Sequence, residues 1–295
     1  MRRNRKKNLL LFHFIVFLFG FTAVLGDLIS ISALPLVIYR MGLASFGLAI
    51  FFIFFYPNYF QLSKLLWGKV VLGGIIIGLH WFTFFYAIKI AGVPLTLSMM
   101  ATGALITAIL DPILNYRKFL SYELIFGSLT AFGIGLIFQA EYEQIKGILI
   151  ALLSAFLSSL FTILNGKMVK QARPITLSFY QLLIGTIIGV ISAFNCNQLN
   201  LEYFQLKNWD LFWIMILAIL CTSYAFNASI KVMQYLSSFT IMMIINLEPI
   251  YGILLSLLIW GEKTYLSFNF YFGFFIVISS IFMNGIYKHK KKLKK

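Results

Sequence analysis

The chain has 295 residues, of which 61% are hydrophobic and only 11% are Asp, Glu, Lys or Arg. Soluble domains carry about 25% charged residues, so this chain has too few charges to cover a water-soluble fold of its size. Its formal net charge of +15 lies in short loops and at the two ends, a pattern that indicates membrane topology and argues against a nucleic-acid partner. The composition therefore predicts an integral membrane protein whose main partner is a lipid bilayer.

Ten apolar segments are long enough to cross the bilayer, because a spanning helix needs about 20 mostly apolar residues. The basic head Met1–Lys7 resembles the start of a signal peptide, but a long apolar run without a small-residue cleavage site follows, and we expect an uncleaved first span. No segment alternates with period two as membrane β-barrels do, so the predicted fold class is all-α. The expected spans are Leu9–Gly26, Leu34–Phe55, Lys69–Ile88, Val93–Asn115, Phe119–Gln139, Gly147–Gly166, Pro174–Asn195, Leu211–Ile230, Leu236–Trp260 and Tyr265–Tyr287.

The basic residues orient these spans. With the N-terminus in the cytoplasm, most Lys and Arg residues fall on the cytoplasmic side, and an even number of spans returns the C-terminus there. The tail Lys288–Lys295 then lies against a leaflet whose anionic lipids attract it. We expect a multi-pass protein of the inner (cytoplasmic) cell membrane with both termini cytoplasmic. The outer side holds only Lys89, Lys146, Lys207 and Lys263, together with Asp27, Glu141, Glu143, Glu202, Asp210 and Glu262.

The second half of the chain repeats the first. The offset between matching positions stays near 140–146 residues, so each repeat holds five spans, residues 1–143 and residues 144–295. Because five is odd, the second repeat enters the membrane upside down, and inverted repeats of this kind serve alternating access to a solute site near the midplane. The matches are KFLSYELIFGSL from Lys118 with KTYLSFNFYFGFF from Lys263, Phe21-Thr22 with Phe161-Thr162, and Tyr39-Arg40 with Tyr180-Gln181.

Three stretches of the spans are distinctive: PLVIYRMGLASF from Pro35, INLEPIYGILLSLLIWGEK from Ile245, and LSFNFYFGFFIVISSIFM from Leu266. They resemble the ten-helix drug/metabolite transporter superfamily, in particular its EamA-like branch. The first half departs from the family pattern, since Ala104 stands where proline is frequent in the fourth span and Tyr116-Arg117 replaces Gly-Glu. The resemblance implies a carrier of metabolites or amino acids, in either direction, and does not name the solute.

Two charged residues lie inside expected spans. Arg40 lies about six residues inside the second span, where an arginine costs at least about 2.5 kcal/mol and usually faces the bundle interior. It fits a clamp for a carboxylate, or a side chain that snorkels toward Asp27. Glu248 lies in the middle of the ninth span beside Asn246, and either exchanges a proton or locks the two halves together. Pro249 should kink this helix and free the carbonyl group of Ile245.

Polar and aromatic residues of other spans are further candidates for a solute cavity. Aromatic walls with a few polar groups suit a small organic molecule, although lipid contact or packing also explains aromatic side chains in a chain with 18% of them. His80 and Phe84 lie beside Trp81 in the third span. The predicted substrate-binding residues are Arg40, Glu248, Asn246, Tyr39, Trp81, Tyr180, Gln181, Tyr224 and Asn227.

No catalytic, metal-binding or ATP-binding motif is found, so we expect no enzyme, no metal and no cofactor, with transport drawing on a gradient. The leading prediction is a secondary carrier or facilitator for an amino acid or similar metabolite. The alternatives are a lipid-modifying membrane enzyme and a non-transporting scaffold. Asp111 with Arg117 predicts a surface ion pair or a gate. Small-residue faces such as Gly74-x-x-x-Gly78 predict helix contacts within the chain first and a dimer second, so the protein is a monomer or homodimer.

Overall fold

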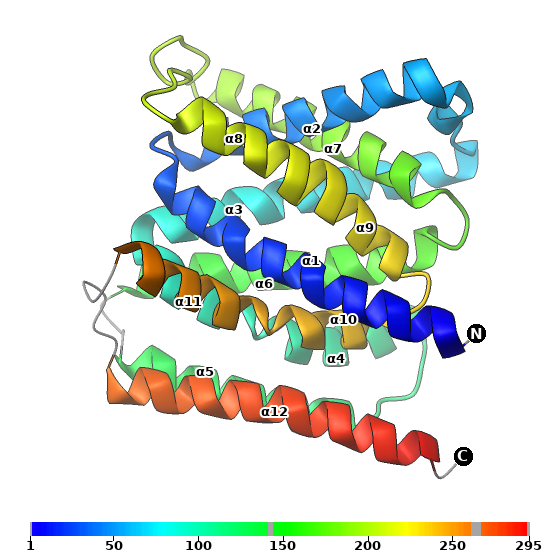
Figure 1. The fold of residues 1–295 in the computed structure, drawn as a ribbon, viewed down its shortest axis with the longest axis vertical. Coiled ribbons are helices and arrows are strands. Elements are labelled where there is room, and N and C mark those ends of the chain that lie inside the picture. The colour runs from blue at the N-terminus through cyan, green and yellow to red at the C-terminus, as the bar shows by residue number, and fades with distance from the viewer. Residues whose placement is uncertain (1, 141–143, 261–266, 294–295) are drawn as a thin grey trace.

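The computed structural model describes residues 2–140, 144–260 and 267–293, and every regular element in these ranges is a helix. The helices run roughly parallel to one another, and the chain passes back and forth between the two ends of the bundle (Figure 1). The N- and C-terminal helices leave the bundle at the same end, which we call the terminal end (right in Figure 1). Glu141, Glu143, Gly261, Glu262 and Lys263, named in the sequence patterns above, lie outside the described residues.

The first half of the chain forms five α-helices, with two short 3-10 turns between the second and the third. Tyr116 ends the fourth helix in the left-handed conformation, with φ 50° and ψ 37°. The elements are α1 (Arg2–Leu28), α2 (Ala33–Phe55), η1 (Pro57–Phe60), η2 (Lys64–Leu66), α3 (Trp67–Met100), α4 (Gly103–Asn115) and α5 (Ser121–Ala140).

The second half contains more interruptions. Pro174 begins its second helix, where the missing N–H costs nothing. Ser237 caps a later one by accepting a hydrogen bond from the Thr240 backbone N–H at 3.3 Å. The elements are α6 (Ile145–Met168), α7 (Pro174–Asn195), α8 (Asp210–Ala218), the π-helical turn η4 (Ile219–Tyr224), α9 (Ala225–Val232), α10 (Ser238–Ile245), α11 (Glu248–Trp260) and α12 (Phe268–Leu293).

Six segments of the described chain are apolar and long enough to cross a membrane. The other segments that the sequence predicts as spans lie in shorter or partly described helices, so the count of ten spans stays a prediction. The six are Lys7–Leu28, Ala33–Phe55, Lys64–Met100, Ile145–Met168, Pro174–Asn195 and Asp210–Val232.

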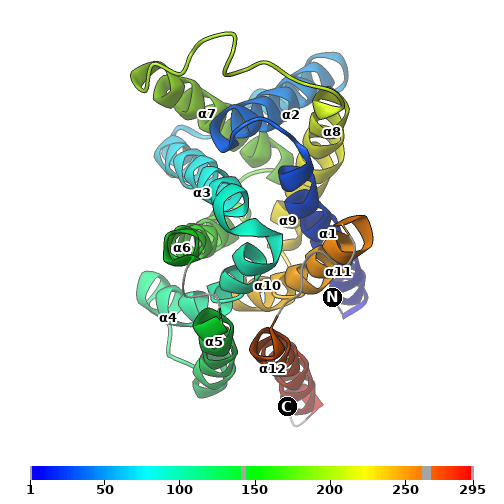
Figure 2. The same cartoon turned by 90° about the vertical axis from the view of Figure 1, so that its left-hand side faces the viewer.

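The helices pack in three groups along the long axis of the molecule. α2 packs against α7 at one extreme, and α5 packs against α12 at the other (Figure 2). Between these pairs, α3 packs along α6 and α1 packs along α11, with α9 and α10 beside α1. The main core of buried side chains runs through this central group and the α2–α7 pair, so a site at the centre touches both halves of the chain.

Three breaks interrupt the helices of the described chain. Gly92 kinks α3 with φ 78° and ψ 167°, a backbone conformation that glycine adopts without strain. Ala101 and Thr102 separate α3 from α4, and the Thr102 hydroxyl donates to the Met99 carbonyl at 2.8 Å. Asn246 and Leu247 separate α10 from α11, so Glu248 opens a new helix.

The crossing of α1 and α11 places Glu248 against the centre of the bundle. An added Cβ on Gly20 would lie 2.8 Å from the Tyr251 Cβ and 2.9 Å from the Gly252 backbone nitrogen. Only glycine lets the two backbones approach this closely, as in small-residue contacts between membrane helices. The pair Gly20 and Gly252 therefore fixes the depth and rotation of α11.

Replacing Gly20 by valine is expected to lower the unfolding temperature in detergent by several degrees. Overpacking costs about 1–3 kcal/mol, and here the contacting atoms are backbone atoms and a Cβ attached directly to the backbone, which cannot yield cheaply. Gly47→Val is the matched control, because a Cβ at this exposed position has no atom within 4 Å. Equal unfolding temperatures for the two variants would show that the crossing is not tight.

Candidate functional site

One pocket opens in the central group of helices, with about 660 Å³ of space that no atom occupies, its mouth included. Its walls come from α1, α2, α3, α6, α9, α10 and α11, and therefore from both halves of the chain. From Arg40 it extends toward the terminal end, where α9 ends and α10 begins. The lining residues are Phe12, Phe19, Thr22, Arg40, Ile77, His80, Trp81, Phe84, Met100, Ser158, Phe161, Thr162, Phe226, Ser229, Met233, Ile241, Ile245 and Glu248.

Arg40 on α2 is only 2% exposed. Its guanidinium carbon lies 3.8 Å from the centroid of the Trp81 ring, and its Nε donates to the Thr222 hydroxyl at 2.6 Å. No hydrogen bond to its terminal nitrogens is formed within the described residues. A planar guanidinium stacked in this way can still offer two parallel N–H groups to one carboxylate.

Glu248, the first residue of α11, is 7% exposed and lines the same pocket. Both ion pairs of the described residues involve Arg117, so Glu248 and Arg40 are not in direct contact. The backbone carbonyl of Ile245, another lining residue, receives no N–H from the helix that follows, because Pro249 has none to give. A carboxylate and a nearby open carbonyl together suit an ammonium group.

The middle of the pocket is aromatic, with a polar edge. Phe226 packs edge-on against Trp81, with ring centroids 5.2 Å apart, and stacks on Phe161 at 5.5 Å. His80 holds its Nδ1 3.0 Å from the Ser154 carbonyl oxygen. Since that oxygen only accepts, Nδ1 carries the proton, and Nε2 is the nitrogen left for other partners. Rings of this size suit the apolar body of a small organic molecule.

At the end of the bundle opposite the termini, polar contacts join the two halves of the chain. Asp210 accepts hydrogen bonds from the backbone N–H of Ser30 at 2.8 Å, from its hydroxyl at 2.6 Å and from the Lys207 N–H at 2.9 Å. The Lys89 ammonium donates to the Ile29 carbonyl. These contacts tie the α1–α2 loop to α3 and to the loop before α8. Groups from both halves of the chain are therefore joined at this end, and none of them lines the pocket.

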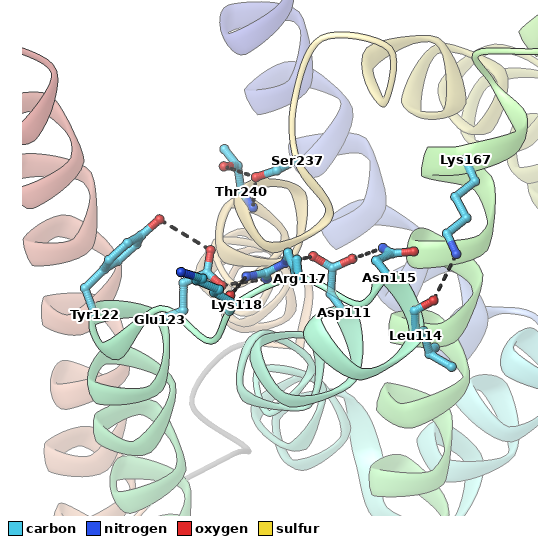
Figure 3. A network of polar contacts seen from close by, with 10 residues as sticks. All are labelled: Asp111, Leu114, Asn115, Arg117, Lys118, Tyr122, Glu123, Lys167, Ser237 and Thr240. Atoms are coloured by element: carbon cyan, nitrogen blue, oxygen red, sulfur yellow. Dashed lines mark hydrogen bonds and ion pairs between the residues drawn. The ribbon is translucent and has the colours of Figure 1, made fainter. Parts of the chain in front are cut away.

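A separate charged cluster lies between α4 and α5 (Figure 3). Arg117 pairs with Asp111 at 2.6 Å and with Glu123 at 2.7 Å, and Asn115 donates to Asp111. The left-handed Tyr116 makes this possible, because it turns the chain so that the Arg117 N–H reaches the Pro112 carbonyl at 3.1 Å. None of these residues lines the pocket, so the cluster fixes the α4–α5 turn.

The structure brings Arg40, Trp81 and Glu248 together in the pocket and places the other predicted site residues elsewhere. Asn246 is 1% exposed at the break before α11, and both its side-chain polar atoms lack a partner. The tyrosines and amides of the remaining set contact loops or neighbouring helices. Tyr39 donates to the Phe204 carbonyl at 2.9 Å, and Tyr180 donates to the Phe60 carbonyl at 2.6 Å. Gln181 donates to Asn165 at 3.1 Å, and Asn227 accepts from Ser178 at 3.4 Å. Tyr224 is 46% exposed.

Sequence reasoning did not select the small hydroxyl residues Thr22, Ser158, Thr162 and Ser229, which line the pocket. Such residues are frequent in membrane helices and carry no distinctive signal on their own. The predicted internal repeat offered such a signal, because Phe21-Thr22 matches Phe161-Thr162 in it, and both threonines line the pocket. Positions shared by the two repeats at membrane depth were therefore a usable signal.

Comparison with known proteins agrees with this architecture. Residues 145–286 match the model of the EamA-like transporter family. The second half of the chain is therefore similar to this family. The family is part of the drug/metabolite transporter superfamily, so the resemblance noted in the sequence is confirmed, and it is carried by the second half, which contains Glu248 and Pro249. The chain is a multi-pass membrane protein whose second half matches a transporter family.

The fold also occurs among solved structures. A structure titled only "Crystal structure of protein" aligns with a TM-score of 0.71 at 12% identity, over 94% of this chain and 96% of that chain. At such low identity the likeness shows the fold alone. None of the curated proteins compared with this chain matches it.

Proposed function

We propose that this chain is a secondary carrier or facilitator that moves an amino acid or a similar small metabolite across the cytoplasmic membrane by alternating access. The observation that carries the proposal is that Arg40 from the first half and Glu248 from the second face one pocket without pairing with each other. Isolated charges at membrane depth are costly and usually mark a solute or ion pathway. A solute with one carboxylate and one amine would satisfy both.

The aromatic wall between the two charges supports a solute with an apolar side chain. Trp81, Phe161 and Phe226 form this wall, and Ser158 and Thr162 add hydroxyl groups beside it. Such a pocket binds mainly through apolar burial, while a few polar groups fix the orientation of the ligand. L-Phenylalanine is therefore a suitable first probe.

Ten spans in two inverted five-helix repeats, residues 1–143 and 144–295, are part of the proposal. The interruption between α3 and α4 falls at the same place in its half as the interruption between α10 and α11. The contacts between helices also correspond between the two halves of the chain. α1 packs on α9 and α11 as α6 packs on α3 and α4, and α2 packs on α8 as α7 packs on α3. This pattern supports two copies that face opposite ways and rock around a shared site.

The proposed orientation places the terminal end in the cytoplasm. Both chain ends leave the bundle on that side, and the basic residues Lys64, Arg117 and Lys167 lie in or beside the turns that join helices there. The bias of Lys and Arg toward cytoplasmic loops supports this choice. The pocket then extends from its charged centre toward the cytoplasm and is closed on the outside. With no ATP-binding motif in the sequence, the proposed carrier uses a gradient.

Purified protein in sealed liposomes tests the function. The expected result is uptake of labelled L-phenylalanine above protein-free liposomes, with competition by other apolar amino acids and little by glucose. The panel includes phenylethylamine and 3-phenylpropionate, which each keep only one of the two charged groups. If no amino acid or related metabolite of a broad panel moves in either direction, the proposed function is wrong.

Removing the outer contacts is expected to favour the outward-open state. In Asp210→Ala the Ser30 and Lys207 donors lose a charged acceptor worth about 1.5–3 kcal/mol, so the outward-open fraction should rise about tenfold or more. The readout is the reaction rate of buried Cys221 with an impermeant maleimide in right-side-out vesicles of a Cys196→Ser background. Glu202→Ala, an exposed acid of the same loop, is the control. An unchanged Cys221 rate in Asp210→Ala would contradict the assignment of these contacts as a gate.

A further inference from the structure

The span that faces Arg40 contains a π-helical turn. In η4 the hydroxyl of Thr222 donates to the Leu217 carbonyl at 2.8 Å, and that of Ser223 donates to the Ala218 carbonyl at 3.0 Å, each five residues back. π-turns inside α-helices are rare and are frequent at functional sites. Here the turn brings a side-chain oxygen to the inner face of the span, where Thr222 is fully buried.

The hydrogen-bond roles of Thr222 are fully determined. A threonine hydroxyl has one hydrogen, and the Leu217 carbonyl, which only accepts, takes it. Oγ1 is thereby left as an acceptor, and the Nε–H of Arg40 donates to it at 2.6 Å. The guanidinium is thus held at its inner nitrogen by Thr222 and on its face by Trp81, 3.8 Å away. Its terminal nitrogens have no partners among the described residues, and Arg40 lines the pocket.

The matching helix of the first half has no such turn. In the internal repeat Arg40 aligns with Gln181, and Gln181 lies against Gly73 of α3 and donates to Asn165. α3 is α-helical over this stretch, its one non-helical residue being Gly92. The π-turn therefore accompanies the arginine and is not a requirement of the fold.

We propose that Thr222, presented by the π-turn, is a positioning residue that aims the two terminal nitrogens of Arg40 at the carboxylate of the solute. This inference rests on the proposed function for the identity of the ligand, whereas the positioning of Arg40 is testable without any ligand. A merely structural threonine would contribute to stability alone. A positioning threonine changes the hydrogen bonding of Arg40 and the affinity for carboxylates while the fold persists.

The ligand-free test uses protein labelled with ¹⁵N-arginine in detergent. The Arg40 Nε–H signal, assigned by its loss in Arg40→Lys, is expected to exchange slowly with solvent because it is buried and bonded. Thr222→Val, which keeps the shape and removes the acceptor, should shift this signal and speed its exchange by about tenfold or more. Thr222→Ser should keep the wild-type signal. An unshifted Nε–H in Thr222→Val would overturn the positioning role.

The second test measures transport in liposomes with L-phenylalanine as the probe. Thr222→Val should raise its KM about tenfold, the factor that corresponds to one hydrogen bond to a charged group, with little change in maximal rate. Thr222→Ser should restore the wild-type KM. Thr107→Val is the control, since Thr107 is equally buried but its hydroxyl has no partner.

The outcomes separate the two proposals. A wild type that carries no probe contradicts the proposed function, while the Nε–H result still decides the positioning of Arg40. A Thr222→Val variant with an altered Nε–H signal and an unchanged KM would show that Arg40 does not meet the carboxylate. A fall in unfolding temperature with unchanged signal and KM would make Thr222 a purely structural residue.

Discussion

Arg40→Gln is expected to lower transport of L-phenylalanine at low concentration by about 100-fold. Truncating one partner of a buried charge pair costs about 2–5 kcal/mol, and each 1.4 kcal/mol is a factor of ten. Glutamine keeps polarity and part of the length, so the pocket does not collapse. The loss should appear in KM for phenylalanine, whereas phenylethylamine, which has no carboxylate, should be much less affected.

The control for Arg40 is Arg173→Gln. Arg173 also stacks on an aromatic ring, with its guanidinium carbon 4.6 Å from the centroid of Tyr59, but it lies outside the pocket. Its replacement should leave transport within about twofold of the wild type, the range of ordinary surface changes. If Arg40→Gln and Arg173→Gln behave alike, Arg40 does not bind the solute.

Glu248→Gln is expected to lower phenylalanine transport by a similar factor, about 100-fold, because the ammonium group loses its only charged partner in the pocket. 3-Phenylpropionate, which has no amine, should lose little or gain. Whether the carboxyl also exchanges a proton is visible in the same assay, since a proton-coupled wild type accumulates solute against its gradient and Glu248→Gln would only equilibrate it.

Glu123→Gln is the matched control for Glu248. Glu123 is 3% exposed, comparable to Glu248 at 7%, but its carboxylate is paired with Arg117 at 2.7 Å, away from the pocket. Its replacement should lower the unfolding temperature and leave KM unchanged. The opposite pattern, in which Glu123→Gln changes KM and Glu248→Gln changes only stability, would reassign Glu248 to a lock between the two halves.

Several elements were accessible from the sequence because their causes are local. Hydropathy over about 20 residues predicts membrane helices, and Pro249 within an apolar run predicts a break, since it lacks an N–H. The break between α3 and α4 has no proline at Ala101 or Thr102 and was not predicted. There the turn depends on packing, for example of Gly103, whose carbonyl accepts from the Ser159 hydroxyl at 3.0 Å.

Some residues of the candidate site could likewise be predicted from the sequence, and others could not. Arg40 and Glu248 stood out because a charge at membrane depth needs a reason. Tyr39 and Tyr180 were selected as polar aromatic residues of the spans, but the structure shows that their hydroxyl groups donate to the backbone carbonyls of Phe204 and Phe60. A tyrosine hydroxyl can bond a loop carbonyl or a bound solute equally well, and no pattern in the sequence distinguishes these two partners.

The sequence by itself determined that the chain is a membrane protein and that one arginine and one glutamate lie inside its expected spans, since hydropathy and charge are properties of single segments. Only the tertiary structure decided that Arg40 and Glu248 share one pocket, that Trp81 and Thr222 hold the arginine there, and that Asp210 bonds Ser30 at the far end. These relations join residues from opposite halves of the chain. They depend on how the helices cross. Side-chain packing at glycine contacts fixes these crossings, whereas the local sequence does not.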